Sequence, residues 1–175
     1  MNAARKELAL VLEYLDVPID LQTFSNRLNV QKKVYLAQIA GIDLGYRYGW
    51  YIRGPYSTSL TQDAFTLKDE IASGDTEYKG FQIAAKVTKA LDHAKKLWEI
   101  PPNFAGGNDD WLELLASLHY LRHIAYRPHG AKRDFDDVFD LLIQSKPKFR
   151  NRKEEARAAW KRLDDFGLVR AKTLG

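Results

Sequence analysis

The sequence predicts a mainly α-helical protein, a compact bundle of about seven or eight helices in one domain that spans residues 1–175, with a small β-strand or hairpin element near residues 46–53. Three observations predict this fold. Apolar residues recur at helical spacing through most of the chain, Gly and Pro separate these segments, and one aromatic stretch, YGWYIRGPYSTSL, interrupts them. The 175 residues are enough to bury one core, and there is no cysteine for disulfides or thiolate metal sites.

Three helices are expected before the aromatic stretch. The first carries one apolar stripe, formed by Leu8, Val11, Leu12 and Leu15. Asp20 is a candidate N-cap for a short second helix at residues 21–28. A third helix is expected at residues 30–40 and ends at Gly41, with residues 31–33 on its more solvated side.

The aromatic stretch is expected to be extended. Residues 46–52 are rich in aromatic and β-branched types and predict a short strand. Gly54-Pro55 should break it, because proline lacks an N–H donor and disfavours helical geometry in the residue before it. One hydroxyl of Ser57, Thr58 or Ser59 then caps a helix that runs to about Ala72.

The second half of the chain predicts four more helices and one clear loop. The loop, EIPPNFAGGND, contains two prolines and two glycines. The helix after it is capped by Asn108 or Asp109 and is apolar nearly all round, so it is expected to be the central buried helix. The helices are expected at residues 83–98, 111–126, 135–144 and 153–166.

Positive charge is concentrated near the end of the chain. The net charge is +4, and from Gln144 onward ten Lys/Arg face four Asp/Glu, so the first 143 residues carry −2. This asymmetry is typical of a surface for nucleic acid or an acidic protein, or of a solvated helix that keeps the chain soluble. The candidate nucleic-acid contacts are Lys146, Lys148, Arg150, Arg152, Lys153, Arg157 and Lys161.

No catalytic motif is recognised. His119 and His123 are four residues apart, the spacing of a two-histidine metal face, and His129 follows, but no glutamate accompanies the pair as in a metalloprotease. There is no phosphate-binding glycine loop and no Gly-x-Ser-x-Gly elbow. The chain is therefore expected not to be an enzyme and to have no cofactor and no metal.

The N-terminal segment does not resemble a signal peptide, because charged residues interrupt its apolar positions. No apolar run approaches the roughly 18 residues of a membrane span. We therefore expect a soluble, cytoplasmic protein that does not bind a membrane.

Aromatic and arginine residues gather in one irregular segment. Arg47 and Arg53 lie among five aromatic residues, Tyr46, Tyr48, Trp50, Tyr51 and Tyr56. Tyr, Trp and Arg are enriched at interaction hot spots, because they desolvate well and keep a polar group for hydrogen bonding. We expect about half of these aromatic side chains to be buried and the others to be displayed.

Residues 27–65, RLNVQKKVYLAQIAGIDLGYRYGWYIRGPYSTSLTQDAF, resemble the Panacea family, the SocA-like antitoxin domain, and are most similar to its uncharacterised YwgA-like branch. In that family a helix with a Leu-Gln-Lys-Leu-Leu-Tyr pattern precedes a short aromatic strand, a Tyr-Gly-Pro turn and a further helix. Arg53 departs from the family pattern, which usually has Tyr there. The matching positions are Gln31, Lys32 and Tyr35 in the helix and Gly54, Pro55, Tyr56 and Ser57 in the turn.

The resemblance implies a non-enzymatic bacterial protein-interaction module, an antitoxin-like neutraliser or a small accessory subunit of a toxin–antitoxin or phage-defence complex. The expected partner is another protein, either a toxin or a larger effector or ATPase subunit. A DNA-binding accessory or regulatory protein that uses the basic C-terminal helices is the alternative. The expected partner-binding residues are Gln31, Lys32, Tyr35, Trp50, Tyr51, Arg53, Gly54, Pro55, Tyr56 and Ser57.

Overall fold

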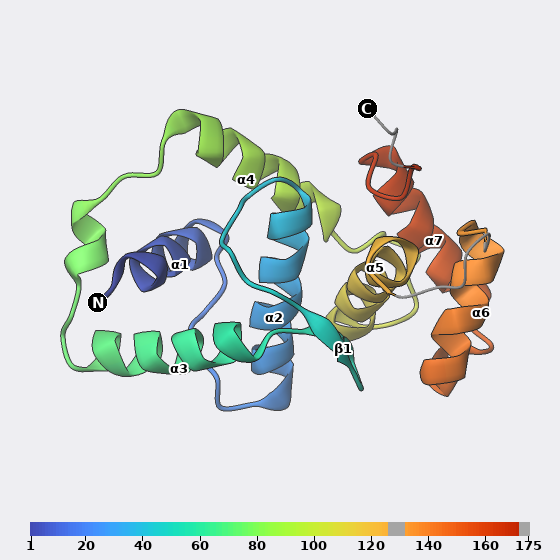
Figure 1. The fold of residues 1–175 in the computed structure, drawn as a ribbon, viewed down its shortest axis with the longest axis horizontal. Helices are drawn as coiled ribbons and strands as arrows, with labels where there is room; N and C mark the ends of the chain where they lie inside the picture. The colour runs from blue at the N-terminus through green and yellow to red at the C-terminus, as the bar shows by residue number, and fades with distance from the viewer. Residues whose placement is uncertain (126–131, 172–175) are drawn as a thin grey trace. The chain divides into compact units, whose positions relative to one another are not determined.

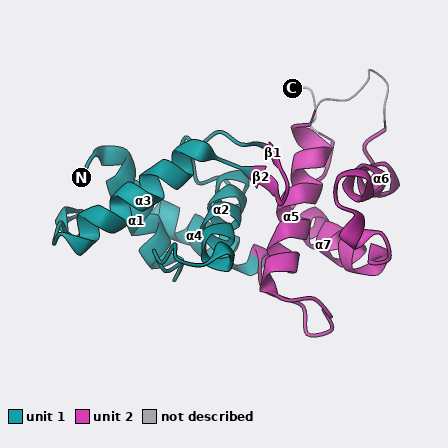
Figure 2. Cartoon of the chain, turned by 90° about the horizontal axis from the view of Figure 1, so that it is seen from below, with its two compact units in different colours: residues 1–49, 56–96 teal, residues 50–55, 97–175 magenta. Residues whose placement is uncertain are grey.

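The chain is mainly helical, as the spacing of its apolar residues predicts (Figure 1). The computed structural model describes residues 1–125 and 132–171. Within these ranges the structure has seven α-helices, two short 3₁₀ helices and one two-stranded hairpin, so the predicted fold class is confirmed. The described residues form two compact units, coloured separately in Figure 2: residues 1–49 with 56–96, and residues 50–55 with the chain from residue 97 onward.

Unit 1 contains four α-helices and one 3₁₀ helix. Three of the α-helices follow the predicted boundaries closely, and hydrogen bonds from backbone N–H groups to the Asn2 and Ser57 side chains cap the first and third. The elements are α1 (Ala3–Tyr14), α2 (Phe24–Ile39), α3 (Thr58–Ala72), η1 (Glu77–Gly80) and α4 (Ala85–Leu97).

Helix α2 corrects the prediction of two separate helices. No Gly or Pro occurs between Phe24 and Ile39, so nothing interrupts the backbone hydrogen bonds where a break was expected. The Thr23 side chain caps the single helix by accepting a hydrogen bond from the Asn26 N–H at 3.1 Å. The predicted stop at Gly41 is confirmed, since this glycine follows the helix with a φ of +107°.

Residues 31–33 were wrongly expected on a solvated side of their helix. Gln31 is 4% exposed and Lys32 is 2% exposed, while Lys33 is half-buried. Buried residues occur around most of α2, so this helix does not have one solvent-exposed face opposite one buried face. Burial of the Gln31 amide is possible because its polar atoms have hydrogen-bond partners at the start of α3.

The hairpin consists of β1 (Gly49–Tyr51) and β2 (Gly54–Tyr56). It is shorter at its start than the predicted strand, and Gly54-Pro55 forms the second strand where a break was expected. The reversal works because Gly54 has a φ of +90°, a conformation that glycine adopts without steric cost. Pro55 is tolerated because a strand of a two-stranded sheet has an unpaired edge that needs no N–H donor.

Unit 2 is built around a helix that is buried on all sides. Helix α5 (Asn108–His123) packs against α6 (Phe135–Ser145) and α7 (Lys153–Asp165), and every residue from 111 to 121 is buried, which confirms the expected central helix. The expected cap at its start was wrong, because Gly107 is the N-cap residue and no side chain caps the helix. The expected extension to residue 126 lies partly outside the described residues.

A short 3₁₀ helix, η2 (Pro147–Phe149), follows α6 directly. Proline at its start ends α6 and drives the preceding Lys146 out of the helical region, to φ −135° and ψ 74°. Across the described ranges, no helix has both the length and the apolar composition needed to cross a lipid bilayer.

Candidate functional site

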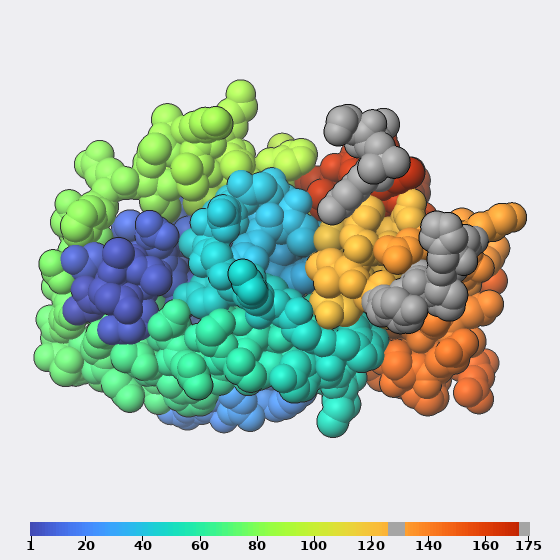
Figure 3. All heavy atoms as spheres, in the orientation of Figure 1, coloured from blue at the N-terminus to red at the C-terminus, as the bar shows by residue number. Residues whose placement is uncertain are grey.

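The two-residue turn of the hairpin, Ile52 and Arg53, projects from the protein surface. In Figure 3 this part of the chain is the teal projection at the lower edge. Ile52 at this turn is 89% exposed, and Tyr51 beside it is 51% exposed. The Arg53 side chain is 45% exposed. We call Tyr51, Ile52 and Arg53 the hairpin tip. An isoleucine this exposed in a folded region is unusual for a residue type that is among the most often buried.

The base of the tip is fixed to the rest of unit 2. The Trp50 ring packs against Tyr120 of α5, with centroids 5.5 Å apart and planes 30° apart. The Lys146 ammonium lies 5.0 Å from the centre of the Trp50 ring and donates a hydrogen bond to the Ile52 carbonyl oxygen. Because one buried lysine contacts both the side chain before the tip and the backbone of the tip, the exposed side chains are presented in one orientation.

A buried carboxylate organises these contacts. Glu113 lies in the part of α5 that is buried on all sides, and its side chain is 0% exposed. Its charge therefore requires cationic partners. Its Oε1 atom lies 3.1 Å from Lys146 Nζ, an ion pair that lacks hydrogen-bond geometry. Its Oε2 atom lies 2.6 Å from Lys148 Nζ and 3.4 Å from an Arg53 nitrogen. One glutamate therefore links the tip, α5 and the segment that follows α6.

Burial shifts the pKa of Lys146. Removal from water lowers the pKa of its ammonium, while the charge of Glu113 acts in the opposite direction. Lysine is nevertheless well suited to this position, since its ammonium can pair with the Glu113 charge while one N–H donates to the Ile52 carbonyl.

A second carboxylate extends the network along α5. Asp110 accepts hydrogen bonds from Lys148 at 3.1 Å and from Arg152 at 2.7 Å. Partial burial would by itself raise the pKa of Asp110, but the hydrogen bonds from Arg152 and Lys148 outweigh it and lower the pKa. A hydrogen bond to Glu155 raises the pKa of Arg152. We call the set Arg53, Asp110, Glu113, Lys146, Lys148 and Arg152 the Glu113 cluster.

The residues predicted for partner binding separate into displayed and buried positions. Tyr51 and Arg53 are at the exposed tip, and Trp50 is half-buried at its base. The remaining positions are buried or half-buried: Gln31, Lys32, Tyr35, Gly54, Pro55, Tyr56 and Ser57.

Gln31 stabilises the start of α3. Its Nε2 atom donates to the Ser57 carbonyl and to Thr61 Oγ1, both at 2.8 Å, and its Oε1 atom accepts from the Ser57 N–H at 2.9 Å. Thr61 in turn donates to the Tyr56 hydroxyl at 2.7 Å. Tyr35 meets Tyr48 edge to face, with centroids 4.9 Å apart. These contacts lie within unit 1. They give Gln31 and Tyr35 of the helix motif, and Tyr56 and Ser57 of the turn motif, a structural role in the fold.

The basic residues proposed for nucleic acid are mostly engaged within the protein. Six of the seven lie within 4.0 Å of a carboxylate oxygen, and Arg150 forms no ion pair with the described residues. Phosphate binding would have to compete with these pairs. Nucleic-acid binding therefore stays a prediction. The contacts of these basic residues in the described part of unit 2 do not add support to it.

The rings of the two histidines of α5 lie against each other, with centroids 4.9 Å apart and planes tilted by 50°. His123 Nε2 lies 2.6 Å from the Leu168 carbonyl oxygen, so this ring nitrogen already has a partner. Between residues 1–125 and 132–171, no group of three His, Cys, Asp or Glu side chains is placed to hold a metal ion. His129 lies outside the described residues.

Two important residues of this site were not predicted. Ile52 was missed because the residue types enriched at hot spots are Tyr, Trp and Arg, although an isoleucine in the turn of an aromatic hairpin is itself a signal of display. Glu113 was missed because it is the one acidic residue within the otherwise apolar stretch 111–121 of α5. One acid inside such an apolar stretch indicates a buried ion pair, and this signal was available in the sequence.

No family model, curated protein or solved structure matches this chain. The resemblance to the Panacea family stays a hypothesis, and the proposed function rests on the hairpin tip and the Glu113 cluster.

Proposed function

We propose that this chain is a non-enzymatic protein-interaction module and that the hairpin tip is its contact element. In this proposal it acts in the bacterial cytoplasm as an antitoxin-like neutraliser or as a small accessory subunit of a toxin–antitoxin or phage-defence complex. The observation that carries the proposal is the 89% exposure of Ile52 on a turn whose backbone is held by a buried lysine.

The energetics favour such a tip as an anchor. Full burial of one isoleucine side chain in a partner contributes about 1.5–3 kcal/mol. Tyr51 and Arg53 beside it are of the types that dominate interface hot spots. The contacts of Trp50 and Lys146 hold the tip in place before binding, so association costs less conformational entropy than it would for a flexible loop.

The charges around the tip indicate the chemistry of the partner. Arg53 and Lys148 both form ion pairs with the Oε2 atom of Glu113, and their side chains are 45% and 37% exposed. Two partly exposed cations share one carboxylate there, and the surface next to Ile52 favours an anionic neighbour. The complementary partner surface is an apolar cavity for Ile52 with Asp or Glu on its rim.

The test is a co-purification from the native locus after nuclease treatment, with retained proteins identified by mass spectrometry. We expect one stoichiometric protein partner with the unchanged chain and its loss with Ile52→Asp or with the double change Tyr51→Ala and Arg53→Ala. Ile100→Asp is the matched control, because Ile100 is a loop isoleucine of unit 2 that is 43% exposed and is not part of the hairpin. Retention of the partner by both tip variants would refute the proposal.

A further inference from the structure

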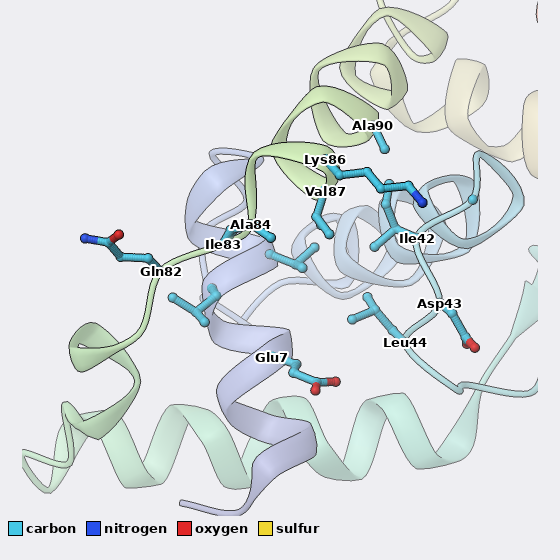
Figure 4. Close-up of a pocket in the computed structure, with 13 residues that line it drawn as sticks. Glu7, Ile42, Asp43, Leu44, Gln82, Ile83, Ala84, Lys86, Val87 and Ala90 are labelled. Carbon is cyan, nitrogen blue, oxygen red and sulfur yellow. The ribbon is translucent and has the colours of Figure 1, made fainter.

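Unit 1 contains a hollow that the proposed function does not use. It has a volume of about 480 Å³ and opens between α1, the segment at residues 41–44 and the start of α4 (Figure 4). This volume is typical of small-molecule sites, which span about 300–1,000 Å³. Most of its wall is aliphatic, formed by Leu10, Val11, Ile42, Leu44, Ile83 and Val87.

Contacts on both sides keep the hollow open. On one side η1 is tied to α1 by Tyr78, which donates to Glu13 at 3.0 Å, and by the ion pair of Lys6 with Glu77 at 2.8 Å. On the other side the later turns of α4 are tied to the end of α1, where Tyr14 donates to Asp92 at 2.7 Å.

The chain between these two ties leaves the apolar wall of the hollow uncovered. Leu91 and Ala94 in the later turns of α4 are fully buried, whereas Val87 in its first turn is 36% exposed. Val87, Ile42 and Leu44 point toward one common space in Figure 4. The apolar surface is therefore left open by the fold itself, which is the condition for a largely preformed ligand site.

Charged groups stand at the edges of this hollow. Glu7 lies at one edge and Lys86 at the opposite edge, with Asp43 beside the aliphatic wall (Figure 4). Neither Glu7 nor Lys86 forms an ion pair with any residue in the described ranges, although Arg5, Lys6 and Lys95 nearby on the same helices all do. Two carboxylates against one ammonium give the rim a net negative charge, which favours a cationic ligand group.

We propose that this hollow binds a small amphipathic amine, with its aromatic or branched aliphatic body against Val11, Ile42, Leu44 and Val87 and its ammonium beside Glu7. An apolar body gains from leaving water, and the ammonium supplies Glu7 with the partner that the fold does not provide. The inference is independent of the proposed function, because the hairpin tip belongs to the other unit.

The test compares three probes that share one body and differ in charge: naphthylmethylamine, naphthylmethanol and naphthylacetic acid. Calorimetric titration of the full chain should rank the amine first, the alcohol second and the acid last. Glu7→Gln should weaken binding of the amine about tenfold and leave the alcohol unchanged. Glu154→Gln, an exposed glutamate of the other unit, is the matched control and should change neither.

A second variant tests the location. Val87→Trp places a large side chain where a partly exposed valine stands, so the fold should survive, and binding of all three probes should be lost. A circular dichroism melt of each variant verifies folding. Equal or tighter binding of the acid, absence of amine binding at millimolar concentration, or binding that survives Val87→Trp would each overturn the proposal.

Discussion

The Lys146 ammonium lies 3.1 Å from Oε1 of Glu113, and neither side chain is more than 2% exposed. The same ammonium holds the backbone of Ile52 and lies over the Trp50 ring. A charge pair withdrawn from water thus supports a hydrophobic residue that is almost fully in water. Buried ion pairs contribute little net stability compared with apolar residues of the same volume, so their worth here lies in fixing the orientation of the tip.

We first predict that the buried pair is sensitive to removal of one partner. Lys146→Met removes the fully buried cation beside Oε1 of Glu113, while Oε2 keeps its pair with Lys148, and the free energy of unfolding should fall by about 3 kcal/mol in urea titrations. The double variant Lys146→Met with Glu113→Leu should be less destabilised than Lys146→Met alone, since neither charge of the buried pair is left and Lys148 keeps its pair with Asp110.

Lys161→Met is the control for this comparison. Lys161 pairs with Asp165 at 2.8 Å on the surface of α7, and its loss should cost under about 0.5 kcal/mol. A cost of similar size for Lys146→Met would contradict the role assigned to the buried pair.

The second prediction concerns the glycine of the hairpin. Gly54→Ala forces an L side chain into a φ of +90° and should lower the free energy of unfolding by about 1–2 kcal/mol. Gly80→Ala is the control, because a Cβ there meets nothing within 4 Å and the backbone is outside the left-handed region, so stability should stay the same or rise slightly. Equal stability of the two variants would show that Gly54 is not held in this conformation.

The third prediction assigns Gln31 to the fold and not to a partner. Gln31→Leu removes the hydrogen bonds to both the N–H and the carbonyl of Ser57. The carbonyl still accepts from the Thr61 N–H, but the buried Ser57 N–H is left unsatisfied, which should cost about 1–3 kcal/mol. Gln22→Leu, at an exposed position before α2, should change stability by less than about 0.5 kcal/mol. If Gln31→Leu melts at the wild-type temperature but loses the partner, the contact role predicted from sequence is right.

The fourth prediction is a pH dependence. The pKa of Asp110 is lowered in the folded protein, so its ionised form stabilises the fold above the ordinary aspartate pKa of about 3.9, and this contribution is lost as the pH falls through the folded-state pKa. Asp110→Asn should therefore be less stable than the wild type by about 1 kcal/mol at pH 7. The difference should shrink as the pH falls below about 3.9.

Urea titrations at a series of pH values measure this difference directly. Asp165→Asn, which removes an exposed carboxylate of α7, is the comparison and should follow the wild type within about 0.5 kcal/mol throughout. A stability gap between Asp110→Asn and the wild type that widens in acid would contradict the predicted direction of the pH dependence.

Local patterns in the sequence predicted most of the helices. The boundaries of α3, α6 and α7 were predicted closely because apolar spacing agrees with a capping side chain in α3 and α6 and with the glycine after α7. The division of α2 was wrong because Asp20 looked like a cap, whereas its side chain instead accepts from the Gln22 N–H outside the helix. Burial of Lys32 could not be predicted, since it depends on neighbours distant in sequence.

The candidate site was predicted in part. The aromatic arm was recognised from its residue types, and Tyr51 and Arg53 are indeed exposed. The cluster that supports it joins a hairpin, the start of α5 and the end of α6, so its three parts are far apart in the chain. No local periodicity encodes such a pairing, and only the acid within the apolar stretch of α5 pointed to it.

The central claim is that Ile52 enters a partner, and affinity is its most direct test. Once co-purification identifies the partner, its dissociation constant should be measured with the wild type, Ile52→Asp and Ile100→Asp. Loss of a hot-spot anchor of about 2 kcal/mol predicts that Ile52→Asp binds about 30-fold more weakly. Ile100→Asp should bind within about threefold of the wild type. Wild-type affinity in Ile52→Asp would contradict the account.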